Sequence, residues 1–154
     1  MKIKQLIYVK LMRKCIVTFF DTNVLIYFTI NQDEQKFEIA KKMIFEAIKQ
    51  DTFFISPMVL SEYIFVLSKY KLTRQHKDKV VLFSKYVNAS IDNTLVLEAY
   101  DVCEKINFCK NINDVIHLKV ADRFCQKLVT FDKDFKKLEN YTDIEIEILP
   151  LKGH

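Results

Sequence analysis

The sequence predicts an α/β fold with a mostly parallel central sheet. Short apolar runs rich in β-branched and aromatic residues, typical of buried strands, alternate along the chain with longer segments of helical periodicity. Two predicted strands, at residues 15–20 and 127–131, are each followed directly by an aspartate. Parallel sheets bind ligands at the carboxyl ends of their strands, so these two aspartates indicate the candidate site.

Composition limits both the size and the class of the protein. A chain of 154 residues, half of them hydrophobic, is long enough for one domain with a well-filled core. The single glycine, Gly153, excludes a P-loop and a dinucleotide-binding fingerprint, because both need several glycines. The longest apolar stretch, residues 15–30, is interrupted by polar residues and is shorter than the roughly 20 residues of a transmembrane helix. We therefore expect a cytoplasmic protein without a membrane partner.

The chain is expected to form one domain over residues 15–150. Residues 1–14 are either an N-terminal extension or an extra strand, and residues 151–154 are expected to be a tail. No C-x-x-C pair is present, which favours reduced core residues over a disulfide or zinc role for the cysteines, Cys15, Cys103, Cys109 and Cys125. The net charge of +4 permits a polyanionic partner. The basic cluster at residues 69–79 is either a solvated helix connection or a rim that contacts phosphates.

The first half of the chain predicts three helices and two strands. The first strand leads into a short helix at residues 23–28, and an amphipathic helix follows over residues 34–49. A second strand is expected at residues 52–55. Ser56 and Pro57 then have the pattern of an N-cap and a first helical residue, which predicts a helix to about residue 70.

The second half continues the alternation. Its predicted elements are a helix over 73–87, a weak strand at 88–91, helices over 95–108 and 115–126, a strand at 127–132 and a turn at 133–138. On the helix over 95–108, we expect the core to be contacted by Leu97, Tyr100, Val102 and Ile106. Asp114 precedes the next helix and heads one of its apolar stripes. Strict alternation over residues 143–149 predicts a half-exposed edge strand.

Four acidic residues stand beside apolar segments: Asp21 and Asp132 at strand ends, Glu62 and Asp114 on early turns of helices. If they converge, these groups repel one another, and each is costly to bury as an anion. A divalent cation removes both costs, and ligation by oxygen alone favours Mg²⁺ or Mn²⁺ over zinc. One or two such ions activate a water and neutralise charge on a phosphodiester, which is nuclease chemistry.

Each acid also has a purely structural interpretation that the sequence leaves open. Asp21 could be only an N-cap, and Asp114 could take part in a capping box. Glu62 could reach solvent at the edge of its helix, and Asp132 could be an ordinary turn residue. We favour a shared site, because it explains all four positions at once. For His117, one turn beyond Asp114, we favour a structural imidazole over an assisting one.

Four motifs surround these acids: Asp21-Thr22-Asn23-Val24-Leu25-Ile26-Tyr27, Ser56-Pro57-Met58-Val59-Leu60-Ser61-Glu62, Asn113-Asp114-Val115-Ile116-His117-Leu118 and Leu128-Val129-Thr130-Phe131-Asp132-Lys133-Asp134-Phe135. In this order they resemble the PIN domain family, and within it the VapC-like toxins of bacterial and archaeal toxin–antitoxin pairs. The resemblance covers residues 15–149. The chain departs from the family at Cys125-Gln126, where a glycine is usual, and at His117 and Lys119, which replace small residues.

The resemblance implies a Rossmann-like α/β/α sandwich with a mostly parallel sheet and a Mg²⁺- or Mn²⁺-dependent endoribonuclease that prefers single strands. It implies catalytic and metal-binding roles for Asp21, Glu62, Asp114 and Asp132, with Asn23, Thr130 and Asp134 as supporting polar residues. Glu62 either binds the metal or orients the attacking water. Family toxins commonly form homodimers and are silenced by a small antitoxin. RNA is therefore the expected substrate, and an antitoxin and a second copy of the chain are the expected partners.

Three other function classes compete with this interpretation. A non-catalytic RNA- or protein-binding scaffold of the same fold needs no converging carboxylates, so the four acids speak against it. A stand-alone PIN nuclease in RNA maturation differs only in lacking an antitoxin gene beside its own. An aspartyl-phosphate phosphatase needs a second aspartate two residues after Asp21, and Asn23 occupies that place.

Overall fold

The structure is a computed structural model that describes residues 15–150. The expectations for residues 1–14, an extension or an extra strand, and for the tail at 151–154 lie outside the described residues. Within the described part of the chain, no helix is both long enough and apolar enough to cross a membrane.

The centre of the fold is a sheet of four parallel strands in the order β2-β1-β3-β4. The strands are β1 (Thr18–Phe20), β2 (Phe53–Phe54), β3 (Lys127–Thr130) and β4 (Glu145–Ile148). From β1 the chain first passes to β2 on one side, and it later returns to β3 on the other side. The carboxyl ends of β1 and β3 therefore flank the point where the strand order reverses, where such sheets bind ligands.

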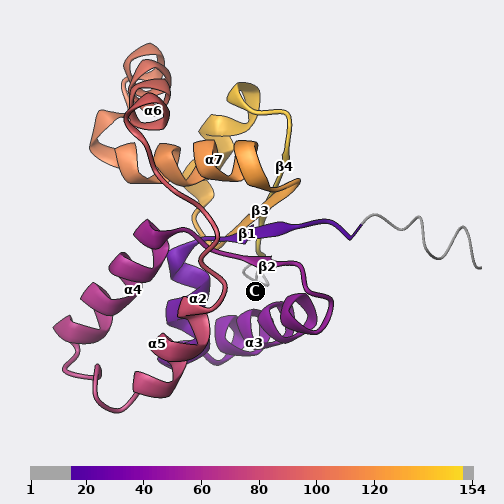
Figure 1. The fold of residues 1–154 in the computed structure, drawn as a ribbon, viewed down its shortest axis with the longest axis vertical. Helices are drawn as coiled ribbons and strands as arrows, with labels where there is room; N and C mark the ends of the chain where they lie inside the picture. The colour runs from indigo at the N-terminus through magenta and orange to yellow at the C-terminus, as the bar shows by residue number, and fades with distance from the viewer. Residues whose placement is uncertain (1–14, 151–154) are drawn as a thin grey trace, which may run out of the picture.

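Helices cover both faces of this sheet, with α6 and α7 on one face and α2, α3, α4 and α5 on the other (Figure 1). Their bounds are α2 (Thr22–Thr29), α3 (Glu34–Lys49), α4 (Pro57–Lys69), α5 (Lys77–Ser84), α6 (Asn93–Ile106) and α7 (Ile112–Phe124), with 3-10 segments η1 (Cys109–Asn111) and η2 (Lys133–Tyr141). This arrangement confirms the predicted α/β/α sandwich with a parallel sheet.

Aromatic residues of the strands fill the space on both faces of the sheet. Phe54 stacks on Phe124 of α7, with 5.8 Å between ring centroids, whereas Phe53 packs 5.9 Å from Phe83 of α5. Successive side chains of a strand point to opposite faces, so neighbouring residues of β2 reach different helix layers. All three residues of β1 are buried as well. Burial on both faces explains why these strands are continuous apolar runs.

Side-chain caps determine where three of the helices begin. Asp33, Ser56 and Asp92 each accept a hydrogen bond from a backbone N–H in the first turn of α3, α4 and α6, respectively. Pro57 is the first residue of α4, where its missing N–H costs nothing. The helix start predicted from Ser56 and Pro57 is therefore confirmed.

The structure corrects two predictions in the middle of the chain. The helix expected over residues 73–87 is limited to α5, whose N-cap residue His76 makes no side-chain capping hydrogen bond. The strand expected at residues 88–91 is wrong, because this segment has no regular structure. Instead, Val87 forms a single parallel bridge to Ile55.

The predicted core residues of α6 are only partly right, because Val102 is buried and Ile106 is half-buried against the core, but the other two face solvent. Leu97 is 58% exposed and Tyr100 is 46% exposed, whereas Leu95, Ala99 and Val102 are buried. The buried residues are spaced four and three positions apart, as one face of a helix requires. Because α6 has apolar residues on more than one face, periodicity alone did not identify the buried one.

The cysteines are only partly where the sequence predicted them. All four are free thiols, and Cys103 and Cys125 are buried as expected. Cys15 and Cys109 are exposed, so their predicted place in the core is wrong. Cys15 precedes β1 and Cys109 begins η1, so neither belongs to the buried stripe of a helix or strand.

The packing of α5 on the core gives a first testable prediction. Phe83 is fully buried and contacts the rings of Phe28, Phe53 and Tyr63. We expect Phe83→Ala to lower the free energy of unfolding by about 3–5 kcal/mol, because it leaves a cavity among these rings. Urea denaturation measures the loss. Val81→Ala, at a half-exposed position of the same helix, is the control, and equal unfolding midpoints for the two variants would contradict the packing described.

Candidate functional site

Asp21 connects the end of β1 to the start of α2 and is almost fully buried. Its Oδ1 accepts a hydrogen bond from the backbone N–H of Thr22 at 2.7 Å. Its Oδ2 accepts from the hydroxyl of Thr130 at 2.6 Å and from the side-chain amide of Asn23 at 2.9 Å. The structural role as an N-cap is therefore real, but the two further donors fix the carboxylate more firmly than capping requires.

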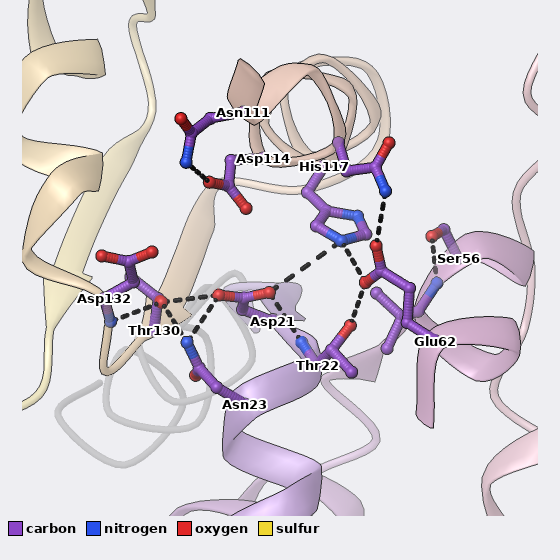
Figure 2. Close-up of polar contacts among 12 residues, drawn as sticks. Asp21, Thr22, Asn23, Ser56, Glu62, Asn111, Asp114, His117, Thr130 and Asp132 are labelled. Atoms are coloured by element: carbon purple, nitrogen blue, oxygen red, sulfur yellow. Dashed lines mark hydrogen bonds and ion pairs between the residues drawn. The ribbon is translucent and has the colours of Figure 1, made fainter. Parts of the chain in front are cut away.

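Asn23 and Thr130 join the ends of β1 and β3 around this carboxylate (Figure 2). The amide of Asn23 also donates to the Thr130 hydroxyl oxygen at 3.1 Å, and its carbonyl oxygen accepts from the backbone N–H of Phe131 at 3.1 Å. Thr130, which is fully buried, accepts a further hydrogen bond from the backbone N–H of Asp132 at 2.9 Å. Asn23 and Thr130, two of the three residues expected to support the site, are therefore in contact with Asp21.

Asp132 follows β3 and caps η2, because its Oδ1 accepts from the backbone N–H of Asp134 at 2.8 Å. Its side chain also lines the pocket that contains Asp21. The carboxylate of Asp134 lies elsewhere, 3.3 Å from the ammonium of Lys137, and does not line this pocket. The structure thus brings the backbone of Asp134, but not its carboxylate, to the site.

Asp114 lies in the first turn of α7 and faces the same pocket. Its carboxylate accepts a long hydrogen bond, 3.3 Å, from the side-chain amide of Asn111, and no other hydrogen bond from the described residues. Burial and the charge of Asp21 raise the pKa of Asp114 to about 6, and the charge of Asp132 adds to the shift. Asp114 is therefore an acid of the pocket whose negative charge the neighbouring side chains do not fully compensate.

Glu62 reaches the site from α4 and is held by three side-chain donors. Its Oε2 accepts from the hydroxyl of Thr22 at 2.6 Å and from Nε2 of His117 at 2.9 Å, and its Oε1 accepts from the amide of Asn113 at 3.0 Å. Burial favours the neutral acid, but the hydrogen bonds and charge of His117 outweigh it and lower the pKa of Glu62. Glu62 is consequently an anchored carboxylate rather than a solvent-facing edge residue.

His117 lies buried between Glu62 and Asp21, with its Nε2 4.0 Å from Oδ1 of Asp21. Burial lowers the pKa of His117, but the hydrogen bond to Glu62 and the charges of both carboxylates outweigh that effect and raise it. Its Nδ1 has no hydrogen-bond partner in the described part of the chain. The ring also packs 5.6 Å from that of Phe19. The imidazole is thus both a packing element and a polar member of the site.

Sequence reasoning missed two further polar residues of the site, Thr22 and Asn113. Both donate to Glu62, from α2 and α7 respectively. Each directly adjoins a predicted acid in the sequence, since Thr22 follows Asp21 and Asn113 precedes Asp114. Short polar side chains at these places were the available signal.

All four predicted acids line one pocket of about 400 Å³ at the carboxyl ends of β1 and β3. The pocket lining also includes the polar residues Thr22, Asn23 and Gln32 and the largely apolar residues Ile26, Tyr27, Phe65 and Val66. A larger cavity of about 600 Å³ near Thr18, Thr52 and Lys127 includes a single acid, Glu46. The smaller, acidic pocket is therefore the candidate functional site.

The donor set of this pocket suits a hard divalent cation, although residues 15–150 contain no group of three Asp, Glu, His or Cys side chains already assembled as a metal site. Asp21, Asp114 and Asp132 offer only oxygen ligands, the type that Mg²⁺ prefers. Asp114 has one weak partner and therefore has free acceptor capacity. Glu62 must give up a hydrogen bond from Thr22 or His117 before its Oε2 can bind a metal.

Comparison with known proteins identifies the family. The crystal structure of VapBC2 from Rickettsia felis bound to a DNA fragment from its promoter matches this fold with a TM-score of 0.62. The match covers 84% of this chain and 96% of that chain at 20% sequence identity, so it shows a shared fold. No curated protein sequence matches. The family model for the PIN domain matches residues 18–141, most of the chain, and the protein therefore belongs to the PIN domain family.

Proposed function

We propose that this PIN domain is a metal-dependent endoribonuclease that hydrolyses RNA phosphodiester bonds. The observation that carries the proposal is the convergence of Asp21, Glu62, Asp114 and Asp132 on one pocket, although the four residues come from four separate segments of the chain. Such a concentration of carboxylates is unfavourable unless a cation shares the site. A non-catalytic scaffold gives no reason for it.

The proposed cofactor is Mg²⁺ or Mn²⁺, as one or two ions held by Asp21, Asp114 and Asp132. A bound divalent cation lowers the pKa of a water and neutralises negative charge on the phosphate. The hydrogen bonds from Thr130 and Asn23 hold Asp21 in position beforehand. Preorganised ligands of this kind avoid a reorganisation cost when the substrate binds.

Glu62 is proposed to orient the attacking water. Its Oε2 already accepts two hydrogen bonds, whereas its Oε1 accepts one, from Asn113, and retains capacity for a water proton. His117 keeps the carboxylate in place and offsets part of the charge of Asp21. The two residues therefore act together on the side of the pocket opposite Asp132 (Figure 2).

The biological role that we propose is that of the toxin in a VapBC-type toxin–antitoxin pair, acting on RNA in the cytoplasm. Membership of the PIN domain family and the fold shared with the VapBC2 structure support this role. The toxin is proposed to form a homodimer and to be silenced by a small antitoxin. A stand-alone nuclease for RNA maturation is the competing role, and co-purification of a small protein encoded next to this chain distinguishes the two.

Cleavage of RNA is the direct test of the proposed activity. We expect the purified protein to cut single-stranded RNA with Mn²⁺ and to be inactive with EDTA. Asp114→Asn should reduce the rate roughly 100-fold or more, because it removes a ligand of the cation. Gel analysis of a labelled RNA measures the rate. The matched control is Asp101→Asn on the exposed side of α6, which should cut at the wild-type rate.

Two results of that assay would contradict the proposal. Cutting that persists in EDTA would show that the reaction does not need a metal. Equal activity of Asp114→Asn and Asp101→Asn would show that the acidic pocket is not the site of cleavage.

The raised pKa of Asp114 gives a separate prediction for the metal-free protein. Because the pKa rises to about 6 on folding, the unfavourable ionised form weakens the folded state above that pH and becomes protonated as the pH falls. Allowing for solvent screening, we expect Asp114→Asn to stabilise the protein by about 1–2 kcal/mol near neutral pH, roughly 3–6 °C in melting temperature. The gain should shrink as the pH falls from about 7 towards 4.

Scanning calorimetry in EDTA measures this difference. Asp101→Asn is again the control and should not change the melting temperature beyond the range of ordinary surface substitutions. A melting temperature of Asp114→Asn equal to or below that of the wild type at neutral pH would show that the pocket is not electrostatically crowded.

A further inference from the structure

The lining of the acidic pocket includes apolar side chains that the proposed chemistry does not use. These are Ile26 and Tyr27 on α2 and Phe65 and Val66 on α4, which we call the apolar wall. Phe65 lies three residues beyond Glu62, so the two side chains share one face of α4. An anchored carboxylate and an aromatic ring are thereby placed next to each other at one opening.

Phe65 is unusually exposed for a side chain of its kind, with 60% of its surface accessible. Leaving a large apolar side chain in water forgoes roughly 1.5–3 kcal/mol relative to burial. Single exposed apolar residues are common on protein surfaces, so exposure alone indicates nothing. Here, however, the exposed ring borders a pocket of about 400 Å³, within the roughly 300–1,000 Å³ typical of small-molecule sites.

Both aromatic residues of this wall have a lysine beside them. The ammonium of Lys69 lies 4.7 Å from the ring centroid of Phe65, and that of Lys36 lies 4.3 Å from the ring centroid of Tyr27. Lys36 also donates a hydrogen bond to the Tyr27 hydroxyl at 2.8 Å. Within residues 15–150 neither lysine forms an ion pair with an acid. Their positive charge therefore remains available to an anionic ligand.

Aromatic rings beside cations are the surface that single-stranded nucleic acid recognises, since bases stack on the rings and phosphates pair with the cations. We infer that Phe65 stacks on an unpaired base of the RNA, next to the phosphate that lies over the acids, and that Lys69 and Lys36 contact neighbouring phosphates. The inference rests on the proposed function and names the form of its substrate. A base held inside a duplex is already stacked and cannot reach the ring.

An apolar helix of a protein partner is the other occupant that this wall would fit. The unpaired lysines beside the apolar wall favour a nucleotide, because it brings an apolar face and phosphates in one ligand. An apolar helix surface matches the wall but leaves both lysines without a partner. Comparing the binding of RNA with and without a base at this contact distinguishes a nucleotide from a protein helix as the occupant.

The inference is tested by binding to two labelled single-stranded RNAs of about ten nucleotides. One RNA has all its bases, and the other has abasic sites in its central half. The full chain carrying Asp114→Asn is used with Mg²⁺, so that cleavage does not interfere, and fluorescence anisotropy reports affinity. We expect Phe65→Ala to weaken binding of the normal RNA roughly 5- to 100-fold and to leave binding of the abasic RNA unchanged. Phe65→Tyr should retain the affinity of the parent.

Two controls accompany this variant. Tyr100→Ala removes an exposed aromatic residue from α6, outside the pocket, and should bind both RNAs like the parent protein. Lys69→Gln should weaken both RNAs to the same extent and lower the slope of log affinity against log salt by about one, as expected for a phosphate contact.

Each contrary outcome overturns the subsite. Unchanged affinity of Phe65→Ala for normal RNA assigns the apolar wall to a protein partner, and equal losses on both RNAs show that Phe65 does not act through a base. If the parent binds neither RNA, the subsite is wrong. This experiment measures binding without cleavage. The proposed nuclease activity is therefore tested independently, by the cleavage assay of wild-type protein with Mn²⁺.

Discussion

The site depends on the burial of one carboxylate, that of Asp21, between the ends of two parallel strands. Burying an anion is costly, and here three donors from Thr22, Asn23 and Thr130 offset part of the cost, although burial still raises the pKa of Asp21. Because Thr130 belongs to β3 and Asp21 follows β1, the same hydrogen bonds fasten the two strands at the point where the strand order reverses. The carboxylate that joins the two strands is therefore also the proposed metal ligand.

The remaining charges of the pocket follow from that arrangement. Glu62 is compensated by Thr22, Asn113 and His117, and the buried imidazole also lies near Asp21. Asp114 has no comparable partner, so its pKa rises through burial and through the charge of Asp21. The protein thus stabilises the charge of Glu62 by itself but leaves the pKa values of Asp21 and Asp114 raised. The proposed cation supplies the charge that is missing at these two acids.

Local sequence signals predicted much of this architecture. The end of the first strand is marked by the apolar run that stops at Asp21, and the start of α4 by Ser56 followed by Pro57. Both signals depend only on neighbouring residues, so these ends could be predicted from the sequence. The contact of His117 with Glu62 joins α7 to α4 across 55 residues, and no local pattern reports such a distance. The exposure of Leu97 and Tyr100 on α6 was not predicted for a similar reason, because packing selects which apolar face is buried. Ion pairing with Lys137 likewise determines where the side chain of Asp134 points.

The central claim is that Asp21 and Asp114 share a divalent cation, and anomalous diffraction from crystals of the full chain soaked in MnCl₂ tests it most directly. The account predicts a manganese peak in the acidic pocket within coordination distance of an oxygen from each of these two carboxylates. The peak should be absent from crystals of Asp114→Asn. Two results would contradict this claim. One is an empty pocket in wild-type crystals at saturating Mn²⁺, and the other is a manganese peak that lies out of coordination distance of Asp114.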